Sequence, residues 1–452
     1  MADVTKHSRA ERIRDVIRYI RKFKNALLVI YIDDEVLDSP FFPNHIQDIG
    51  LIHETGLQVI IVPGAHKRID EILSASNISW TEKNGIRITP PEAMPLIKMA
   101  AFDVSNTIMT SLAGEHLNAV IGNWVRARSK GVLDGFDFGT SGEIDKLQID
   151  AIRKVLSNGF IPIFPCIGWS AAGKPYNISS IQLAQEIAIH LQADKLFYLI
   201  PHAEINATNF KIPENLSITP EDTIPALSLD ELKIFIKDNG ISSNTEKITN
   251  DHMLKNKILS ILSLAQEACE QGVSRVHLLN SFIDGALPCE IFSDLGSGTM
   301  IYSNQYGGIR DMTREDIPSV LSLMRPFVRK GILLPRTKQQ LFSDFQDYIV
   351  YELDGCIRAC AALHLYNGGQ AEIAGVAVDE SCEHIGIGPK IITYLIEKAK
   401  QLKVVSIFIL TTQSSDWFEQ LGFRQDDISS LPQKRKDQWT AKRNSKVFRR
   451  KI

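Results

Sequence analysis

Two apolar segments near the C-terminus each carry a side chain suited to proton transfer. Glu372 lies within residues 371–378, an apolar run typical of a β-strand. A second run, residues 404–410, leads into small hydroxyl residues, of which Thr411 is the first. Lysines and arginines follow from Lys434 onward. Because such cations bind anions through charge-assisted hydrogen bonds, this region is predicted to hold an anion beside a reactive centre.

A glycine-containing loop lies between the first of these strands and a predicted helix, residues 388–402. Gly386 and Gly388 are separated by one residue and stand where that helix begins. Backbone N–H groups at a helix N-terminus bind phosphate, and glycine lets a ligand approach the backbone closely. A Gly-x-Gly pair alone is more often an ordinary turn, so both interpretations stay open at this stage.

The bulk properties are those of a globular protein with more than one domain. The chain has 452 residues, of which 44% are apolar and 23% charged, and its net charge is −3. This length predicts two or three domains. The charged N-terminus lacks the apolar segment of a signal peptide, and no run of about 18 apolar residues could span a membrane. We therefore expect a cytoplasmic protein that does not bind a membrane.

Metal and nucleic-acid binding are disfavoured by the placement of residues. The six cysteines form neither a Cys-x-x-Cys pair nor a zinc-ligand spacing, which favours free thiols and no metal. Between Lys434 and Lys451, nine lysines or arginines accompany one acidic residue, Asp437. Because few aromatic residues are interleaved, we expect no nucleic-acid partner. Residues 449–451 are expected to be solvated.

The hydrophobic pattern predicts an α/β fold. Continuous apolar runs bounded by turn residues indicate strands buried on both faces, as in a parallel sheet covered by helices. In the first 300 residues we predict strands at 26–32, 57–62, 117–121, 159–164, 195–200 and 276–279, and helices at 9–24, 89–112, 180–191 and 253–271.

A polar connector at residues 302–308 separates this part from a smaller one. The smaller part is predicted to contain helices 314–330, 337–347 and 388–402 and strands 348–353, 356–364, 371–378 and 404–410. The predicted domains are therefore residues 1–305 and 306–452.

Motifs spread along the C-terminal part carry a resemblance to a known family. They are the strand–turn–helix around Gly386 and the segments Glu372-x-x-x-Val376, Leu410-Thr411-Thr412, Trp417-Phe418-x-x-x-Gly422-Phe423, Leu431-Pro432 and Arg443-Asn444-Ser445. The strand–turn–helix resembles the acetyl-CoA motif of GNAT acetyltransferases, and the motifs together resemble the bacterial N-acetylglutamate synthases. The resemblance covers nearly the whole chain. It implies acetyl transfer from acetyl-CoA to the α-amine of L-glutamate, the first step of arginine biosynthesis.

The resemblance also implies roles for individual residues. Glu372 would accept the proton of the amine, directly or through water. Thr411 would protonate the leaving thiolate, with Ser414 in reserve; the tyrosine that many acetyltransferases of this fold use is not evident. The glutamate carboxylates would be bound by Arg336, Lys434, Arg443 and Ser445. Acetyl-CoA would be bound by Val376, Ala377, Val378, His384, Ile385, Gly386, Ile387 and Gly388.

Each of these residues also has a purely structural interpretation. Glu372 could be an exposed strand residue, Thr411 an ordinary strand end, and any one of the cations a solvated surface side chain. The loop also departs from the family pattern, because Glu383 stands where a glutamine or arginine is usual. Two alternative functions therefore stay open: acetylation of a different amino acid or amine, and a non-catalytic role as a sensor of arginine.

The N-terminal part resembles the amino-acid kinase fold of acetylglutamate kinases. The matching motifs are Pro63-Gly64-Ala65-His66, Asn84-Gly85-Ile86-Arg87, residues 177–180, residues 193–197 and Asp284-Gly285. Working kinases of this kind place a lysine and two glycines after the first strand to hold the transferred phosphate. Tyr31, Asp33 and Asp34 stand there instead, and Ile181 replaces an organising aspartate. We therefore expect no phosphoryl transfer.

In the family, this kinase-like domain binds arginine as an effector and assembles the oligomer. The corresponding positions are Tyr19, His277, Glu290, Gly296 and Gly298. His277 could equally be a core histidine, and Tyr19 could simply pack on the sheet. The resemblance implies a homo-oligomer, either a hexamer or a tetramer, with helix 9–24 as a contact; it does not decide whether arginine inhibits or activates.

Overall fold

The structure is a computed structural model, and its two units are described separately. Contacts along the chain divide it into Met1–Ser303 and Asn304–Ile452. The structure describes residues 16, 17, 20 and 23–452, apart from 84, 214, 215, 217, 220, 221, 241–249, 293–296, 304–306, 354, 355, 380–385, 441 and 442. The predicted helix 9–24 therefore lies mostly outside the described residues.

The first unit is built on an eight-stranded sheet. In spatial order its strands are β14 (Ala226–Ser228), β16 (Thr299–Tyr302), β15 (Arg275–Asn280), β13 (Lys195–Ile200), β1 (Leu27–Ile32), β2 (Gln58–Pro63), β10 (Ile161–Ile163) and β5 (Ala119–Ile121). All neighbouring strands run parallel except β15 and β16. Every residue of β1 and β13 is buried, as expected for a sheet covered on both faces.

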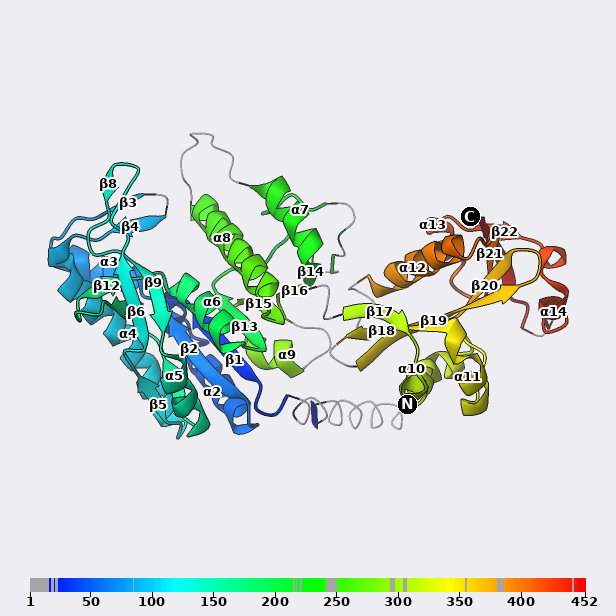
Figure 1. The fold of residues 1–452 in the computed structure, drawn as a ribbon, viewed down its shortest axis with the longest axis horizontal. Coiled ribbons are helices and arrows are strands. Elements are labelled where there is room, and N and C mark those ends of the chain that lie inside the picture. The colour runs from blue at the N-terminus through cyan, green and yellow to red at the C-terminus, as the bar shows by residue number, and fades with distance from the viewer. Residues whose placement is uncertain are drawn as a thin grey trace. The chain divides into compact units, whose positions relative to one another are not determined.

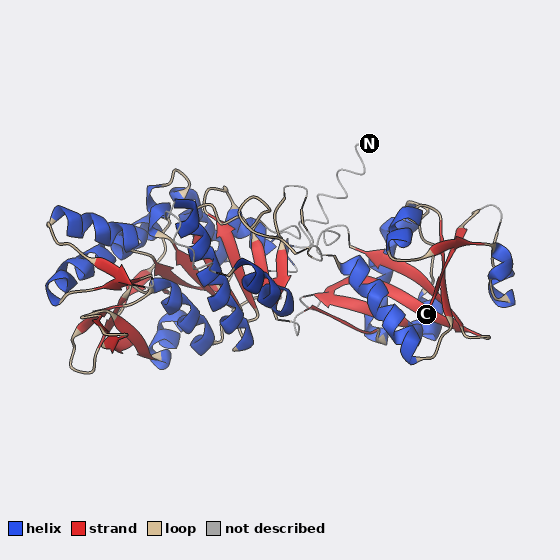
Figure 2. Ribbon diagram, turned by 90° about the horizontal axis from the view of Figure 1, so that it is seen from above, coloured by secondary structure: helices blue, strands red, loops and turns tan. Residues whose placement is uncertain are grey.

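Helices cover both faces of this sheet, and Figure 2 shows the strands between them. Alternate residues of β1 point to opposite sides: Leu28 and Ile30 pack in one core, and Leu27 and Val29 in the other. The first face is covered by α2 (Phe42–Glu54), the end of α4 (Met94–Gly114) and α9 (Ala286–Phe292). The second face is covered by α5 (Ile149–Ser157), α6 (Ser180–Leu191), α7 (Leu229–Asn239) and α8 (Asn250–Glu270).

A second, four-stranded sheet in this unit was not predicted from the sequence. Its order is β12 (Pro175–Asn177), β11 (Ile167–Trp169), β6 (Val125–Ser129) and β9 (Gly142–Leu147). These strands are short, and β6 and β9 combine a few buried residues with charged residues that are partly or fully exposed. Their apolar signal is correspondingly weak.

The second unit contains one seven-stranded sheet. In spatial order its strands are β17 (Gly307–Asp311), β18 (Tyr348–Leu353), β19 (Cys356–Tyr366), β20 (Gln370–Val378), β21 (Ser406–Thr411), β23 (Lys446–Lys451) and β22 (Arg424–Asp426). Only β20 and β21 run parallel to each other. One face is covered by α12 (Ile387–Gln401), and the other by α10 (Ile317–Arg329) and α11 (Lys338–Asp344), as Figure 1 shows.

These sheets and the helices that cover them confirm the predicted α/β class, but some element ends differ from expectation. The predicted helix 89–112 begins only at Met94, after a short 3-10 turn at Pro91–Ala93, because prolines at 90 and 91 lack the N–H donor of a continuing helix. The C-terminal cations at 449–451 were expected to be solvated, which is wrong for Arg449 and Arg450, because both are half-buried in β23; Lys451 is exposed, as expected. Among the helices in the described part of the chain, none is long and apolar enough to cross a membrane.

Candidate active site

The opening of the candidate site lies where the two parallel strands of the second unit separate. β20 and β21 pair through Gln370, Ala371 and Glu372, opposite Ser406, Ile407 and Phe408. Both strands continue beyond Glu372, but their pairing ends there. Residues 376–378 of β20 therefore turn one backbone edge toward the space between the strands, while Ala377 and Val378 still pair with β19 on the other side. That edge can receive a ligand with amide groups.

A glycine makes this separation possible. Gly375 has a φ of +61°, and the pairing of β19 with β20 shifts register between Cys360 and Ala362. A shift of this kind bends a strand. A side-chain carbon on Gly375 would lie 3.0 Å from Cε of Met324 and 3.4 Å from the Tyr348 ring. Both the backbone angle and the close packing therefore favour glycine at this position.

The start of α12 lies beyond the far end of β20. Gly386, the residue that caps this 15-residue helix, has a φ of +68°. A side-chain carbon on Gly388 would lie 3.1 Å from Cζ2 of Trp417. The side chain of Ile387 is buried in the core, which leaves its backbone as the part available to a ligand. His384 and Ile385 of the predicted acetyl-CoA loop, and Glu383 with them, lie outside the described residues.

The Glu372 carboxylate is buried and receives hydrogen bonds from two side chains. Only 4% of the residue is exposed, so it is not an exposed strand residue. Arg435 Nε lies 3.0 Å from Glu372 Oε1 and 2.9 Å from Oε2. The Tyr366 hydroxyl donates to Oε2 at 2.9 Å. Burial and the neighbouring Glu372 charge raise the pKa of Tyr366, which keeps this hydroxyl protonated and able to donate.

Two more arginines lie close to Arg435. Arg443 donates to the carbonyl of Ile332 at 2.6 Å. Burial lowers the pKa of Arg443, and the positive charges of Arg435 and Arg336 lower it further. Arg336 also contacts the Tyr348 hydroxyl, whose pKa burial raises to about 12. Among the described residues, Glu372 is the carboxylate that is paired with this cluster, so the site carries a surplus of positive charge suited to anions.

The remaining predicted glutamate-binding residues, Lys434 and Ser445, differ in burial. Lys434 is exposed on α14 (Gln433–Lys436), whereas its neighbour Arg435 reaches Glu372. Ser445 is buried, and its carbonyl accepts a hydrogen bond from Trp439 Nε1 at 3.2 Å. It directly precedes β23, whose first residue pairs with Thr411.

Arg435 and Tyr366 were not identified from the sequence. Arg435 stands within a run of cations that the sequence alone does not distinguish. Tyr366 is positioned by a hairpin: it pairs with Gln370 across a turn containing two glycines, which brings it diagonally opposite Glu372. Tyr366 is bonded to Glu372, so it does not stand as the thiolate-protonating tyrosine that was not evident in the sequence.

The hydroxyl residues at the end of β21 form a local turn. Thr411 Oγ1 accepts a hydrogen bond from the Ser414 backbone N–H at 3.0 Å, which holds both predicted proton donors together. Thr411 is half-buried, as is Ser414. This turn lies on the strand that separates from β20, so it borders the same opening.

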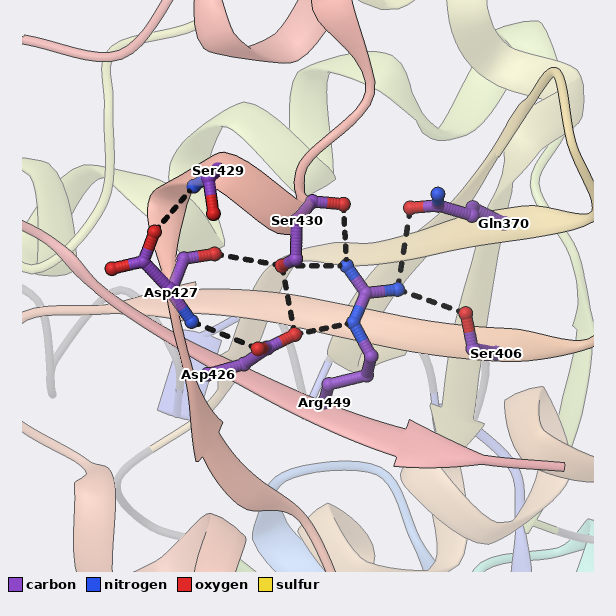
Figure 3. A network of polar contacts seen from close by, with 7 residues as sticks. All are labelled: Gln370, Ser406, Asp426, Asp427, Ser429, Ser430 and Arg449. Atoms are coloured by element: carbon purple, nitrogen blue, oxygen red, sulfur yellow. Dashed lines mark hydrogen bonds and ion pairs between the residues drawn. The ribbon is translucent and has the colours of Figure 1, made fainter.

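Arg449 makes hydrogen bonds to residues of β20, β21 and β22 and to Ser430, as Figure 3 shows. Its Nε donates to Asp426 at 2.5 Å, and its Nη1 donates to Ser406 Oγ at 2.8 Å and to the side chain of Gln370 at 3.2 Å. Its Nη2 donates to the Ser430 carbonyl at 2.9 Å and to Ser430 Oγ at 3.0 Å. Because Ser430 begins the segment that carries Arg435 and Arg443, Arg449 anchors that segment to the sheet.

In the first unit, at the positions where the resemblance places the phosphate site of the kinases, the chain's own side chains bond to one another. The Tyr31 hydroxyl donates to Asp33 at 3.1 Å, and Lys257 forms an ion pair with the same carboxylate. Asp34 accepts the backbone N–H of Arg68, in α3 (His66–Ala75), at 3.1 Å. Burial and the charge of Asp33 raise the pKa of Asp34. Two buried carboxylates thus stand where a phosphate would need positive charge.

Two of the predicted arginine-site residues, His277 and Glu290, form a buried pair. His277 Nδ1 lies 2.6 Å from Glu290 Oε1, and the ring stacks on Phe197 with 4.7 Å between centroids. Glu290 Oε2 accepts the backbone N–H groups of Ser297 at 2.5 Å and Gly298 at 3.1 Å. The amide of Gly298, another predicted arginine-site position, thus bonds Glu290 here. Tyr19 and Gly296 lie outside the described residues.

A group of His, Cys, Asp and Glu side chains able to hold a metal does not occur within the described ranges.

Comparison with known proteins matches each unit to a family. Residues 27–280 match the amino acid kinase family, and residues 317–423 match the acetyltransferase (GNAT) family. With the separated strands and the glycine-containing helix start, these matches define an acetyl-CoA-dependent acetyltransferase joined to a kinase-like unit.

Relatives also match nearly the whole chain. It is 31% identical to an amino-acid acetyltransferase of Mannheimia succiniciproducens over 436 residues, which is 95% of each chain. It is 32% identical to that of Actinobacillus pleuropneumoniae, again over 95% of each chain. The chain therefore belongs to the amino-acid acetyltransferase family.

Solved structures agree with this assignment. N-acetylglutamate synthase from Neisseria gonorrhoeae, complexed with coenzyme A and L-arginine, is 28% identical with a TM-score of 0.78 and covers 98% of this chain and 99% of its own. The same enzyme complexed with coenzyme A and N-acetyl-glutamate is 29% identical with a TM-score of 0.60 and the same coverage. The resemblance found in the sequence, including an acetyltransferase that uses acetyl-CoA, is confirmed.

Proposed function

We propose that the protein transfers the acetyl group of acetyl-CoA to the α-amine of L-glutamate, giving N-acetyl-L-glutamate and CoA. The observation that carries the proposal is the buried Glu372 carboxylate, which is paired with Arg435 where the pairing of β20 and β21 ends. The charges of Arg435 and Arg336 act in turn on Arg443. An acceptor with two carboxylates offsets the surplus positive charge of these arginines. The Neisseria enzyme complexed with N-acetyl-glutamate supports the choice of acceptor.

The residues supply the steps that acetyl transfer to an amine requires. Glutamate arrives with a protonated amine, and Glu372 takes one proton from it, directly or through water. The free amine attacks the thioester carbonyl, so that a C–N bond forms and the C–S bond breaks. The thiolate then takes a proton from the hydroxyl turn of Thr411 and Ser414, and the second proton of the attacking nitrogen, released as the amide forms, replaces it. Tyr366 holds Glu372 through the hydrogen bond from its hydroxyl, which its raised pKa keeps protonated.

The acetyl donor is placed along the free edge of β20. Backbone groups of Val376 and Val378 pair with the amides of the pantetheine arm and polarise the thioester carbonyl. The N–H groups at the start of α12 take the pyrophosphate, where Gly386 and Gly388 keep the backbone accessible. Trp417, packed against Gly388, closes one side of this helix start.

We also propose that L-arginine binds the first unit near His277 and Glu290 and changes turnover. The Neisseria structure containing L-arginine supports this. Glu290 is buried and ionised, which suits a guanidinium, but its carboxylate already accepts Ser297 and Gly298. Arginine binding therefore requires these bonds to be shared or rearranged. Addition of arginine is expected to raise the melting temperature and to alter the rate; no change in either contradicts the proposal.

The kinase-like unit is proposed to have no phosphoryl-transfer activity. Lys257 is already paired with Asp33, and the Asp33 and Asp34 carboxylates repel a nucleotide triphosphate. Phosphorylation of N-acetylglutamate by ATP at enzymatic rates would contradict this.

The acceptor is tested by measuring CoA release from acetyl-CoA across a panel of amino acids and simple amines. Release with glutamate, at a kcat/KM at least 100-fold above that of any other acceptor, is expected. Greater activity with another amine would assign a different acceptor. The absence of acceptor-dependent release would favour a non-catalytic arginine sensor.

A further inference from the structure

Arg435 contacts Glu372 with only part of its guanidinium group. Both of its hydrogen bonds to the carboxylate come from Nε, at 3.0 and 2.9 Å. The hydrogen bonds that the described residues make with this side chain leave the two Nη groups open to an acceptor. A guanidinium can bind a second carboxylate through such a pair of N–H groups while it keeps the first.

The position of Arg435 is fixed by the segment that carries it. Its backbone N–H donates to the Pro432 carbonyl at 2.8 Å, and the preceding Leu431 is buried against Phe408. Ser430 is held by Arg449. The Arg435 side chain is only 13% exposed, so it is held at the site and does not swing freely in solvent.

The charges around Arg435 favour a second carboxylate. Arg443 pairs with a neutral carbonyl, that of Ile332, and its pKa is lowered by the charges of Arg435 and Arg336. The charges of Arg435 and Arg336 both act on Arg443, so the binding of a further anion here relieves this repulsion.

We propose that Arg435 determines acceptor specificity by joining an acceptor carboxylate to Glu372, with Nε on Glu372 and the Nη groups on the acceptor. This inference rests on the proposed function and goes one step beyond it. Without an acceptor, the guanidinium charge acts on Glu372 alone. When an acceptor carboxylate binds the Nη groups, it shares that charge, and Glu372 accepts the ammonium proton more readily. Proton transfer is thereby coupled to recognition of a carboxylate.

This role differs from simple orientation of Glu372. If Arg435 only orients the carboxylate, its loss slows the reaction of every amine by the same factor. If it couples recognition to proton transfer, its loss affects acceptors with the recognised carboxylate far more than acceptors without it.

The test uses the full-length protein and three acceptors: glutamate, glutamine, which lacks the side-chain carboxylate, and glutamate α-amide, which lacks the α-carboxylate. The variants are Arg435→Met and the control Lys436→Met, which removes the next cation of the same short helix. The wild type is expected to prefer glutamate over both amides. In Arg435→Met this preference should fall at least tenfold for one of them, which identifies the carboxylate. Lys436→Met should keep the wild-type preference.

A second readout follows CoA release without any acceptor, with water as the nucleophile. Release of Glu372 from Arg435 is expected to raise this rate in Arg435→Met, an effect that a misfolded variant does not show. A preference for glutamate that is unchanged in Arg435→Met overturns the inference, whatever the acceptor-free rate. Wild-type protein that does not acetylate glutamate would instead overturn the proposed function and this inference together.

Discussion

The Trp417 ring packs against Gly388 at the start of α12, so closely that a side-chain carbon on the glycine would lie 3.1 Å from Cζ2 of the ring. The ring itself is held by Phe418, 4.6 Å away between centroids. Because the proposed pyrophosphate site is the start of this helix, the space above Gly388 decides how closely a ligand approaches the backbone.

Gly388→Ala is therefore expected to raise the KM for acetyl-CoA about tenfold, because Trp417 or the helix start must shift. The KM for glutamate should change little. Steady-state kinetics with each substrate varied in turn measures both effects. Gly308→Ala is the matched control, since a side-chain carbon there meets no atom within 4 Å. An acetyl-CoA KM equal to that of the control would count against the pyrophosphate site.

Arg443→Ala should raise the KM for glutamate about 10- to 100-fold, because a charge-assisted hydrogen bond to a carboxylate is lost. The KM for acetyl-CoA should change by no more than about twofold, which is much less than the change expected in the KM for glutamate. Arg424→Ala, which removes an exposed arginine of β22, serves as the control. Equal increases in the two KM values would remove Arg443 from the glutamate site.

The sequence predicted the class of fold and most buried strands, because continuous apolar runs such as β1 and β13 are distinctive. The sequence did not predict that Arg435 pairs with Glu372 while Lys434 is exposed, because this depends on how a four-residue helix is oriented. Arg449 was misjudged for a related reason: β23 pairs with β21, about forty positions earlier in the chain. A local run of cations carries no information about such a distant partner.

Arg449→Met is expected to lower the free energy of unfolding by about 3 kcal/mol, because Asp426 loses its cationic partner in a mostly buried network. The glutamate KM should also rise, because Arg449 would no longer hold Ser430, where the segment that carries Arg435 and Arg443 begins. Denaturant unfolding and kinetics measure the two effects. Lys451→Met, an exposed cation of the same strand, should leave both unchanged. A fully stable Arg449→Met protein with wild-type kinetics would show that the network is dispensable.

The His277–Glu290 pair predicts a loss of stability in acid. Burial lowers the pKa of His277 to about 4, although Glu290 opposes this shift. Burial alone would raise the pKa of Glu290, but His277 and the Ser297 amide outweigh it and hold the pKa at about 2. Both folded-state values lie below those of the unfolded chain, so the unfolded chain binds more protons in acid.

The histidine contribution is fully present above about pH 6.5 and is lost as the pH falls toward 4; the glutamate contribution is lost from about pH 4.5 toward 2. The melting temperature should therefore fall steadily below pH 6.5. His277→Gln, which cannot titrate, should show a shallower fall between pH 6.5 and 4.5. Identical slopes for the variant and the wild type would show that His277 does not contribute.

The central claim is that Glu372 accepts the proton of the glutamate amine. The most direct measurement is the rate of N-acetylglutamate formation by Glu372→Gln, with both substrates saturating. Glutamine keeps the side-chain shape but is not a base, so kcat should fall about 100- to 10,000-fold while the acetyl-CoA KM changes little. The defect should be smaller with an acceptor amine of lower pKa. A Glu372→Gln protein with wild-type kcat would contradict the claim.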